Sequence, residues 1–219
     1  MPLAYRIVIR LSETKRTRLR APERRDRILA AAVEVFAARG YDGAGMGEIA
    51  ARAGIVPSVI YDHFPSKRAL HVELLERHGQ TLIDRSIGDI AGSSPRAIHG
   101  ASVAAFFRFV EEDPFVWRFL FRDPPADAEI AAVHAAIHER ATAGLASLVR
   151  AGAPPSDAVL GVPAARATWM LARAAQGATN GLAAWWYEHP EVPREQVVAL
   201  ATELLWDGFG RLAAAAASD

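Results

Sequence analysis

Residues 40–67 read GYDGAGMGEIAARAGIVPSVIYDHFPSK, and this stretch decides how the chain is organised. Within it, Met46, Ile49 and Ala53 recur three or four residues apart, which predicts the apolar face of a short helix. Gly54 follows directly and can end that helix by adopting a left-handed backbone conformation. The first half of the stretch therefore predicts a helix over 46–53 that stops at a tight turn.

A second short helix is predicted after the turn. Pro57 suits the first turn of a helix, because its missing N–H would be unpaired there anyway. Ile60 and Phe64 lie four residues apart, on the inner face of this helix. Two short helices joined by a Gly-containing turn indicate a helix-turn-helix, the unit that lays its second helix in the major groove of DNA.

The remainder of the sequence shows apolar residues at helical spacing, separated by Pro and Gly. No convincing strand alternation follows the first 21 residues, so we expect an all-α protein. The three short N-terminal helices bury too little surface to be stable alone and should pack on the longer helix that follows them. The helices expected outside the opening stretch span 22–40, 67–90, 95–112, 114–121, 127–150, 162–188 and 193–217.

Composition narrows the class of protein. The chain has 219 residues and no cysteine, which excludes disulfides, thiolate nucleophiles and Cys-based zinc sites. Charged residues interrupt every apolar run before it reaches the roughly 18 residues that a membrane span needs. No secretory signal is visible at the N-terminus. We therefore expect a cytoplasmic protein with no membrane partner.

Charge is distributed unevenly although the formal net charge is zero. Residues 1–70 hold 13 Lys/Arg and 7 Asp/Glu, a net charge of +6, whereas residues 71–219 hold 12 and 18, a net charge of −6. Residues 1–21 alone contain six Lys/Arg and one acidic residue, which predicts a flexible basic arm. Positive charge confined to the end that contains the helix-turn-helix is the pattern expected of a protein that binds phosphates there.

A set of residues in and around the helix-turn-helix has the spacing of a known family. The chain resembles the tetracycline-repressor (TetR) family of bacterial transcriptional regulators. This resemblance implies a DNA-binding domain at 22–68 and an effector-binding and dimerisation domain at 69–219. It also implies a ligand-responsive repressor without a cofactor, which binds a palindromic operator as a homodimer and is released by a small lipophilic or aromatic effector. The matching residues are Phe36, Gly40-Tyr41, Ile49-Ala50, Ala53-Gly54, Tyr61, His63-Phe64, Ser66-Lys67 and Leu70.

The same resemblance assigns residues to the DNA contact. The Tyr61 hydroxyl and Lys67 would reach phosphates, whereas Asp62 could accept from a cytosine amino group. Pro57 could press against a thymine methyl group. Gly45 departs from the family pattern, because relatives carry there a Ser or Thr that caps the helix and touches phosphate. The residues carried over as DNA-facing are Gly45, Pro57, Ser58, Tyr61, Asp62, His63 and Lys67.

Aromatic and polar residues in the acidic half are candidates for a ligand site. Seven aromatic residues crowd between 106 and 121 and could line a lipophilic cavity or simply fill the core. A polar stripe in the 162–188 helix must meet a ligand, a partner subunit or other buried polar groups, since buried polar groups must be paired. The ligand-binding candidates are Phe107, Trp117, Phe121, His134, His138, Trp169, Arg173, Gln176 and Asn180.

His134 and His138 lie four residues apart, the spacing of two metal ligands on a helix. No third ligand is evident, so we expect no metal and no enzyme. Two alternatives remain open: a metal-assisted enzyme that uses these two His residues, or an all-α ligand-binding protein whose DNA binding is weakened by Gly45, Gly47 and Val56.

Small and apolar residues at helical spacing also predict the dimer contact. Small residues let two helices approach closely, and the last two helices carry them on one side. We expect these helices to pair with their copies in a four-helix interface, as the resemblance implies. The residues of this expected interface are Gly177, Gly181, Ala184, Ala201, Leu204, Leu205, Gly208 and Leu212.

Overall fold

The structure, a computed structural model, describes residues 20–87, 94–121, 127–152, 158–159 and 161–216. It confirms the all-α prediction. One pair of two-residue antiparallel strands, β1 (Ala158–Val159) and β2 (Val162–Pro163), accompanies the helices. The helices are α1 (Ala21–Gly43), α2 (Met46–Ala53), α3 (Pro57–His63), α4 (Lys67–Ile87), α5 (Pro95–Glu112), α6 (Pro114–Phe121), α7 (Ala128–Gly152), α8 (Ala164–Glu188) and α9 (Arg194–Ala216).

Three expected helix starts lie one or two residues before the helix: Asp127, Val162 and Pro193, the last of which directly precedes α9. Val162 and Pro163 lie in β2 instead of beginning α8, because two-residue strands are too short to show alternation in the sequence. Asp127 precedes α7 and caps it, accepting hydrogen bonds from the N–H groups of Glu129 and Ile130 at 3.1 and 3.2 Å. The expected basic arm, apart from Arg20 and Ala21, and the expected end of the 67–90 helix beyond Ile87 lie outside the described residues.

Glycine conformations confirm the breaks read from the sequence at the N-terminal end. Gly40 interrupts α1 with φ of +69°, so the chain turns there before it reaches α2. Gly54 ends α2 in the left-handed region, with φ of +69° and ψ of 34°. Residues with a Cβ rarely adopt this conformation, which explains glycine at both turns.

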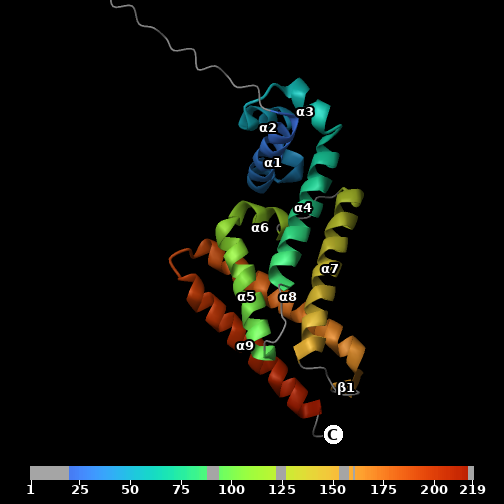
Figure 1. Cartoon of the computed structure of the whole chain (residues 1–219), viewed down its shortest axis with the longest axis vertical. Coiled ribbons are helices and arrows are strands. Elements are labelled where there is room, and N and C mark those ends of the chain that lie inside the picture. The colour runs from blue at the N-terminus through green and yellow to red at the C-terminus, as the bar shows by residue number, and fades with distance from the viewer. Residues whose placement is uncertain (1–19, 88–93, 122–126, 153–157, 160, 217–219) are drawn as a thin grey trace, which may run out of the picture.

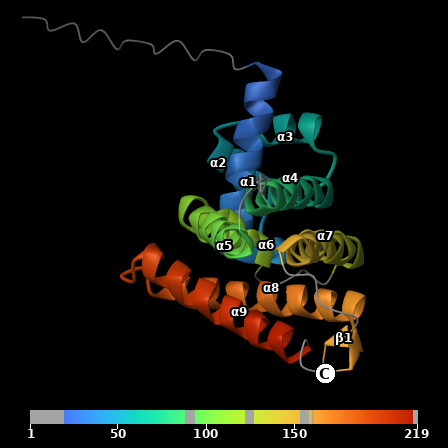
Figure 2. The ribbon, with the colours of Figure 1, turned by 60° about the horizontal axis from the view of Figure 1, so that its bottom comes forward.

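The helices form an elongated molecule with α1, α2 and α3 at one end (Figure 1). From that end α4 runs into the larger part, where it packs against α7 and α5. Figure 2 shows α5, α6 and α7 as a layer between α4 on one side and α8 and α9 on the other. Gly79 brings α4 and α7 close together, because a Cβ at this position would lie 2.7 Å from Cγ2 of Ile137.

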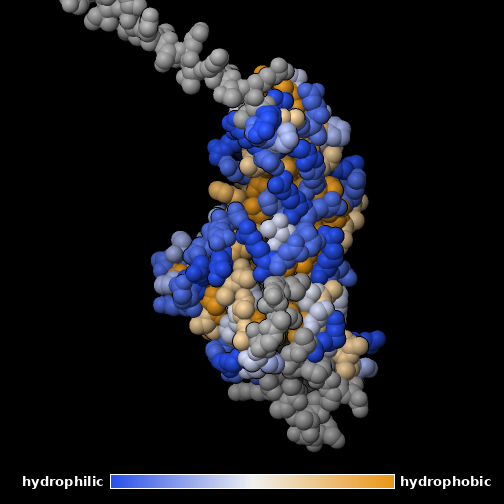
Figure 3. All heavy atoms as spheres, in the orientation of Figure 1, coloured by the Kyte–Doolittle hydropathy of each residue, from blue (hydrophilic) through white to orange (hydrophobic). Residues whose placement is uncertain are grey.

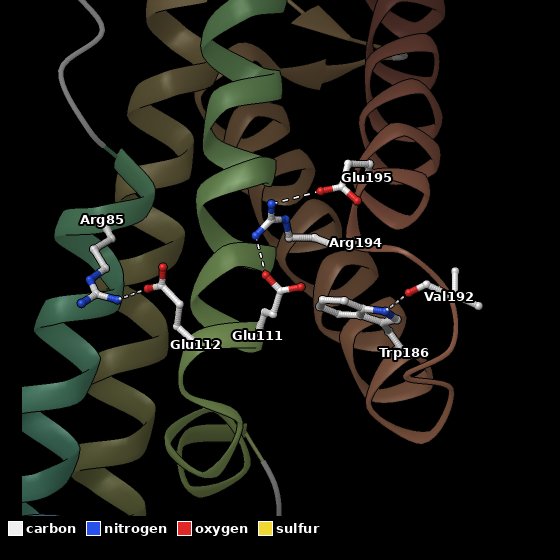
Figure 4. A network of polar contacts seen from close by, with 7 residues as sticks. All are labelled: Arg85, Glu111, Glu112, Trp186, Val192, Arg194 and Glu195. Carbon is white, nitrogen blue, oxygen red and sulfur yellow. Dashed lines mark hydrogen bonds and ion pairs between the residues drawn. The ribbon is translucent and has the colours of Figure 1, made fainter.

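Salt bridges hold the end of α5 to two other helices (Figure 4). Arg85 of α4 donates to Glu112 at 3.2 Å, and Arg194 at the start of α9 donates to Glu111. Beside them, the indole N–H of Trp186 donates to the carbonyl of Val192 at 2.8 Å and fixes the turn between α8 and α9. The C-terminal end of α5 is therefore tied to α4 on one side and to α9 on the other.

An aromatic cluster around His71 joins the N-terminal helices to the larger part. The His71 ring on α4 lies 4.7 Å from the Phe36 ring of α1 and 4.7 Å from the Phe119 ring of α6, between ring centroids. The Tyr41 ring lies 5.0 Å away. Burial first, and then the charges of His134 and Lys67, lower the pKa of His71 to about 3. His71 is therefore a neutral, buried ring in the joint between the two parts.

None of the helices in the described ranges combines the length and the apolar composition required to cross a bilayer.

Acid should destabilise the protein through His71. Because its folded pKa of about 3 lies below the ordinary value of 6.5, the unfolded chain binds more protons between these two pH values. The stability contributed by neutral His71 is complete above pH 6.5 and falls as the pH drops towards 3, by about 2 kcal/mol at pH 5. The free energy of unfolding from urea titrations at pH 7 and pH 5 measures this change.

The matched variant is His71→Met, which keeps an unbranched side chain of similar size and does not titrate. Its loss of stability between pH 7 and pH 5 should be smaller than that of the wild type. The other buried His residues titrate in both proteins and cancel in the comparison. Equal losses in the two proteins would contradict the buried, neutral state of His71.

Candidate functional site

The turn between α2 and α3 has the geometry that the sequence predicts. The N–H of Gly54 donates to the carbonyl of Ala51 at 3.1 Å, and the N–H of Ile55 donates to the carbonyl of Ala50 at 3.0 Å. Ile49 of α2 and Ile60 of α3 are fully buried in the hydrophobic core. Hydrogen bonds and apolar contacts therefore fix the angle between the two short helices.

The outer side of α3 is free for contact with another molecule. Tyr61 is 54% exposed, so its ring is not part of the core. Phe64 directly after α3 is buried and anchors the opposite side of the helix. On the face shown in Figure 3, hydrophilic residues cover most of the end formed by α1, α2 and α3. The exposed residues on α3 and just before it are Val56, Pro57, Ser58, Tyr61 and Asp62, and His63 is half-buried.

The start of α2 presents backbone in place of a side chain. Gly45 occupies the N-cap position and offers no side-chain oxygen to the first turn of the helix. No atom lies within 4 Å of where a Cβ would be at Gly45 or Gly47. The space that a longer side chain would occupy is therefore open at both positions.

Lys67 is held by the protein itself. Its Nζ donates to the carbonyl oxygens of Tyr41 at 2.7 Å and of Ala44 at 3.0 Å, and it lies 4.5 Å from the centre of the Tyr41 ring. A third carbonyl, that of Asp42, lies at 3.5 Å. These bonds engage the donors of the ammonium group, so the geometry does not favour the phosphate contact expected for Lys67. Its position indicates that it closes the loop that leads into α2.

Several cations of the basic end are likewise paired within the protein. Arg39 pairs with Glu48 at 3.3 Å, and Arg52 pairs with Glu34, so the positive charge of this end is partly neutralised locally. Arg27 is exposed and has no ion pair among the described residues. Its guanidinium lies beside the turn, 3.4 Å from the position of a Cβ at Gly54. No pattern in the sequence distinguishes Arg27 from the paired arginines.

Arg68 connects the first turn of α4 with the start of α7. Its guanidinium donates to Asp127 at 2.9 Å and pairs with Glu129 at 3.3 Å. Asp127 caps α7 with its other oxygen, so the start of α7 is linked to the first turn of α4, where Lys67 holds the carbonyl oxygens just before α2. The sequence reading missed this contact, because the partners lie 59 residues apart in the chain.

Three of the predicted ligand-binding aromatic residues meet around Phe121. The Phe121 ring lies 6.5 Å from that of Trp117 and 5.4 Å from that of His138. Phe106 connects Phe121 with Phe107, at 6.3 and 5.3 Å. Residues from α5, α6 and α7 thus form one aromatic cluster, in which Phe107 and Trp117 are buried.

A polar cluster between α7 and α8 adjoins these rings. The hydroxyl of Thr142, a fully buried residue that the sequence reading missed, lies 2.8 Å from Oε1 of Gln176 and 2.8 Å from the carbonyl of His138. Arg173 donates to the same hydroxyl at 3.4 Å. Asn180 donates through Nδ2 to the carbonyl of Gln176 at 3.0 Å. The predicted polar stripe therefore turns inwards, towards α7.

Trp169 does not share this placement. It lies seven residues before Gln176 and is exposed on the surface of α8. The structure thus brings together all the predicted ligand-binding residues of α6 and α7 and three of those on α8, but leaves Trp169 outside.

His134 and His138 stack on each other, one turn apart on α7. Their ring centroids are 5.6 Å apart. Burial, together with the neighbouring His138, lowers the pKa of His134, and burial, together with Arg173, lowers that of His138. Among the described residues, no three His, Asp or Glu side chains come together as possible metal ligands. The His138 ring packs with Phe121 in the aromatic cluster, and His134 stacks on His138.

The outer sides of α8 and α9 carry part of the expected dimer interface. Gly177, Gly181, Ala184 and Gly208 are exposed, and Leu204 is 57% exposed. Other large apolar side chains that the sequence reading missed extend the same sides of the two helices. They are Met170, Trp185 and Leu200.

Two expected interface residues were placed on the wrong side of α9. Ala201 is fully buried and Leu205 is 9% exposed, because both pack against the core of their own chain. Positions 201 and 205 lie four apart and share the inner side of the helix, whereas 200, 204 and 208 share the outer side. Leu212 lies in α9, but its side chain is outside the described part of the structure.

Known proteins share both the helix-turn-helix and the fold. The family described as bacterial regulatory proteins, tetR family, matches residues 28–74. The HTH-type transcriptional activator FasR of Mycolicibacterium smegmatis is 41% identical over 109 residues, which cover 48% of this chain and 49% of that protein. The HTH-type transcriptional repressor KstR of Rhodococcus jostii is 30% identical over 113 residues, 49% of this chain and 53% of that protein. The chain therefore spans about half the length of the curated relatives it matches.

Solved structures resemble nearly the whole chain. A TetR-like transcriptional regulator from Rhodococcus sp. RHA1 has a TM-score of 0.73 and 25% identity, covering 88% of this chain and 99% of that one. FadR of Bacillus subtilis, solved in complex with stearoyl-CoA, has a TM-score of 0.65 and 18% identity, covering 82% of this chain and 95% of that one. The match over residues 28–74 identifies the helix-turn-helix as one of the tetR family of bacterial regulatory proteins, and 88% of the chain shares the fold of a TetR-like transcriptional regulator.

Proposed function

We propose that this protein is a transcriptional regulator that binds operator DNA through α3 as a homodimer and responds to a lipophilic effector. The observation that carries this proposal is the exposed outer side of α3. The inner side of the same helix-turn-helix is buried in the core, which holds α3 in place. The relatives FasR and KstR are named as an activator and a repressor, respectively. We favour a repressor, in which the DNA-bound state lacks the effector.

Contacts with DNA divide into positioning and reading. The hydroxyl of Tyr61 and the unpaired guanidinium of Arg27 supply phosphate contacts, which fix position without reading sequence. Ser58, Asp62 and His63 read base edges in the major groove, and Pro57 presents apolar surface to a thymine methyl group. Gly45 lets the backbone at the start of α2 come close to the DNA.

The effector is proposed to bind among α5, α6, α7 and α8, beside the aromatic and polar clusters. The similarity of the fold to FadR, solved with stearoyl-CoA, supports a lipophilic ligand. Binding there would displace α7, and the pairing of Asp127 with Arg68 would pass the displacement to α4 and to the loop before α2. Tenfold release of DNA requires about 1.4 kcal/mol of difference in effector affinity between the two states.

The DNA-binding step predicts distinct effects for two substitutions on α3. Selection of bound sequences from random DNA should yield a near-palindromic consensus for the wild-type protein. Asp62→Ala should relax the preference at one base pair in each half-site, at a cost of about 1–3 kcal/mol for the preferred base. Tyr61→Phe should weaken binding to all sequences alike, because a phosphate contact carries no sequence information.

Glu191→Ala, an exposed acidic residue between α8 and α9, is the control and should leave both affinity and consensus unchanged. Binding that does not distinguish one sequence from random DNA would overturn the proposal. It would favour an all-α ligand-binding protein with weakened DNA binding.

If the outer side of α9 lies in the proposed dimer interface, a charge introduced there should separate the subunits. Leu204→Glu should give a monomer by light scattering at micromolar concentration and should lower operator affinity at least tenfold, although residue 204 is far from α3 in the sequence. Phe115→Glu replaces an equally exposed apolar residue on α6 and should leave the dimer intact. A wild-type protein that is monomeric under these conditions would contradict the proposed interface.

The effector step predicts that stearoyl-CoA, used as a probe, lowers operator affinity in a mobility-shift assay. The effect should be absent for coenzyme A alone, which lacks the acyl chain. Arg68→Gln should reduce the response to stearoyl-CoA, because it removes the charged contact with Asp127. If stearoyl-CoA binds, as measured by calorimetry, and operator affinity stays the same, the proposed response is wrong.

A further inference from the structure

Asn180 carries a buried oxygen that nothing in the described part of the chain pairs. Its Nδ2 donates to the carbonyl of Gln176 at 3.0 Å. The reversed amide would place two oxygens against each other, so this bond fixes which end of the side chain is Oδ1. Oδ1 is shielded from solvent and has no hydrogen-bond partner among the described residues. A buried acceptor without a donor is disfavoured, so this oxygen is available to a group that donates.

Neighbours on α8 show which way Asn180 faces. Gln176 and Ala183 lie four residues before it and three after it, and both are buried against the rest of the chain. Gly177 and Gly181, at i−3 and i+1, lie on the exposed side. Asn180 is half-buried at the border between the two sides, but its Oδ1 is shielded from solvent and so belongs to the inner side of α8.

Helix direction places Asn180 beside the aromatic cluster. A short connection through β1 and β2 joins α7 and α8, and the two helices pack together, so they run antiparallel. Thr142 meets Gln176 at 2.8 Å. One turn further along α8, Asn180 is level with His138, one turn earlier on α7. The His138 ring packs against Phe121 at 5.4 Å, so Asn180 lies next to this cluster.

Among the residues that the structure describes, Trp117 on α6 carries an unpaired donor, the complement of the unpaired acceptor on Asn180. Its indole N–H is buried and has no hydrogen-bond acceptor within the described ranges. The ring lies 6.5 Å from Phe121 and 5.7 Å from Tyr187. Among the described residues, Asn180 on α8 therefore offers an unpaired acceptor and Trp117 on α6 an unpaired donor, both near Phe121.

We propose that the site between α6, α7 and α8 selects lipophilic ligands that carry a secondary amide or a hydroxyl group, with Asn180 Oδ1 accepting from the ligand N–H or O–H and Trp117 donating to a ligand oxygen. An ester or a carboxylate only accepts and leaves Asn180 unpaired, and a hydrocarbon satisfies neither group. The aromatic rings contact the apolar body of the ligand. This inference rests on the proposed effector site and adds the chemistry that the site recognises.

Two isosteric probes test the donor requirement. N-Methyldodecanamide and methyl dodecanoate differ only by N–H in place of an ester oxygen. Titration calorimetry on the full chain should give at least tenfold tighter binding of the amide. A site that needs a donor rejects the analogue that lacks one, because a buried protein group is then left unpaired.

Asn180→Leu is the informative variant, because it replaces the amide oxygen and nitrogen with two methyl groups in a side chain of similar size. The amide-to-ester ratio should fall to near one, while binding of the ester persists. The melting temperature should stay the same or rise, since an unpaired buried acceptor has been removed. Trp117→Phe is the matched control: it removes a donor that both probes use, so it should weaken both and preserve their ratio.

Several results would overturn the inference. They are the absence of binding by either probe, equal affinities in the wild type, or an amide preference that survives Asn180→Leu. A fall in melting temperature on Asn180→Leu would also overturn it, because the Asn180 oxygen would then stabilise the folded protein without a ligand. A mobility-shift assay with the amide keeps the two proposals apart: amide preference without operator release supports the recognition chemistry and contradicts only the effector role.

Discussion

The packing of a neutral imidazole between rings of two other helices holds the molecule together as one unit. Three short helices bury too little apolar surface to be stable alone, so α1, α2 and α3 depend on what they pack against. His71 of α4 supplies that support by contacting Phe36 of α1 and Phe119 of α6. The orientation of α3 is consequently set by helices that belong to the larger part of the chain.

The first turn of α4 concentrates the remaining contacts between the two parts. Lys67 holds the carbonyl oxygens of Tyr41 and Ala44 just before α2, and Arg68 pairs with Asp127, the cap of α7. A helix that carries both contacts on adjacent residues cannot shift without moving the start of α2. Because Asp127 caps α7, the helix that bears His138 and Thr142 shares this mechanical connection.

Local patterns in the sequence predicted the local structure well. Gly54 and Pro57 constrain their own backbone, so the helix-turn-helix could be predicted from them, and Tyr61 could be placed through the family resemblance. The sequence could not show that Lys67 bonds to carbonyls more than 20 residues away, or that Thr142 pairs with Gln176. Ala201 and Leu205 were misassigned because both sides of α9 are rich in apolar residues, and periodicity alone does not tell which side meets the core.

Gly79 gives the contact between α4 and α7 a particular mechanical character. Between most packed helices a layer of side chains separates the backbones, and these side chains absorb small displacements by changing rotamer. At Gly79 the α4 backbone meets Ile137 directly, and the β-branched isoleucine has little rotamer freedom in a helix. Steric contact at this point prevents α4 from approaching α7 any further, so a displacement of α7 towards α4 must move α4 as well.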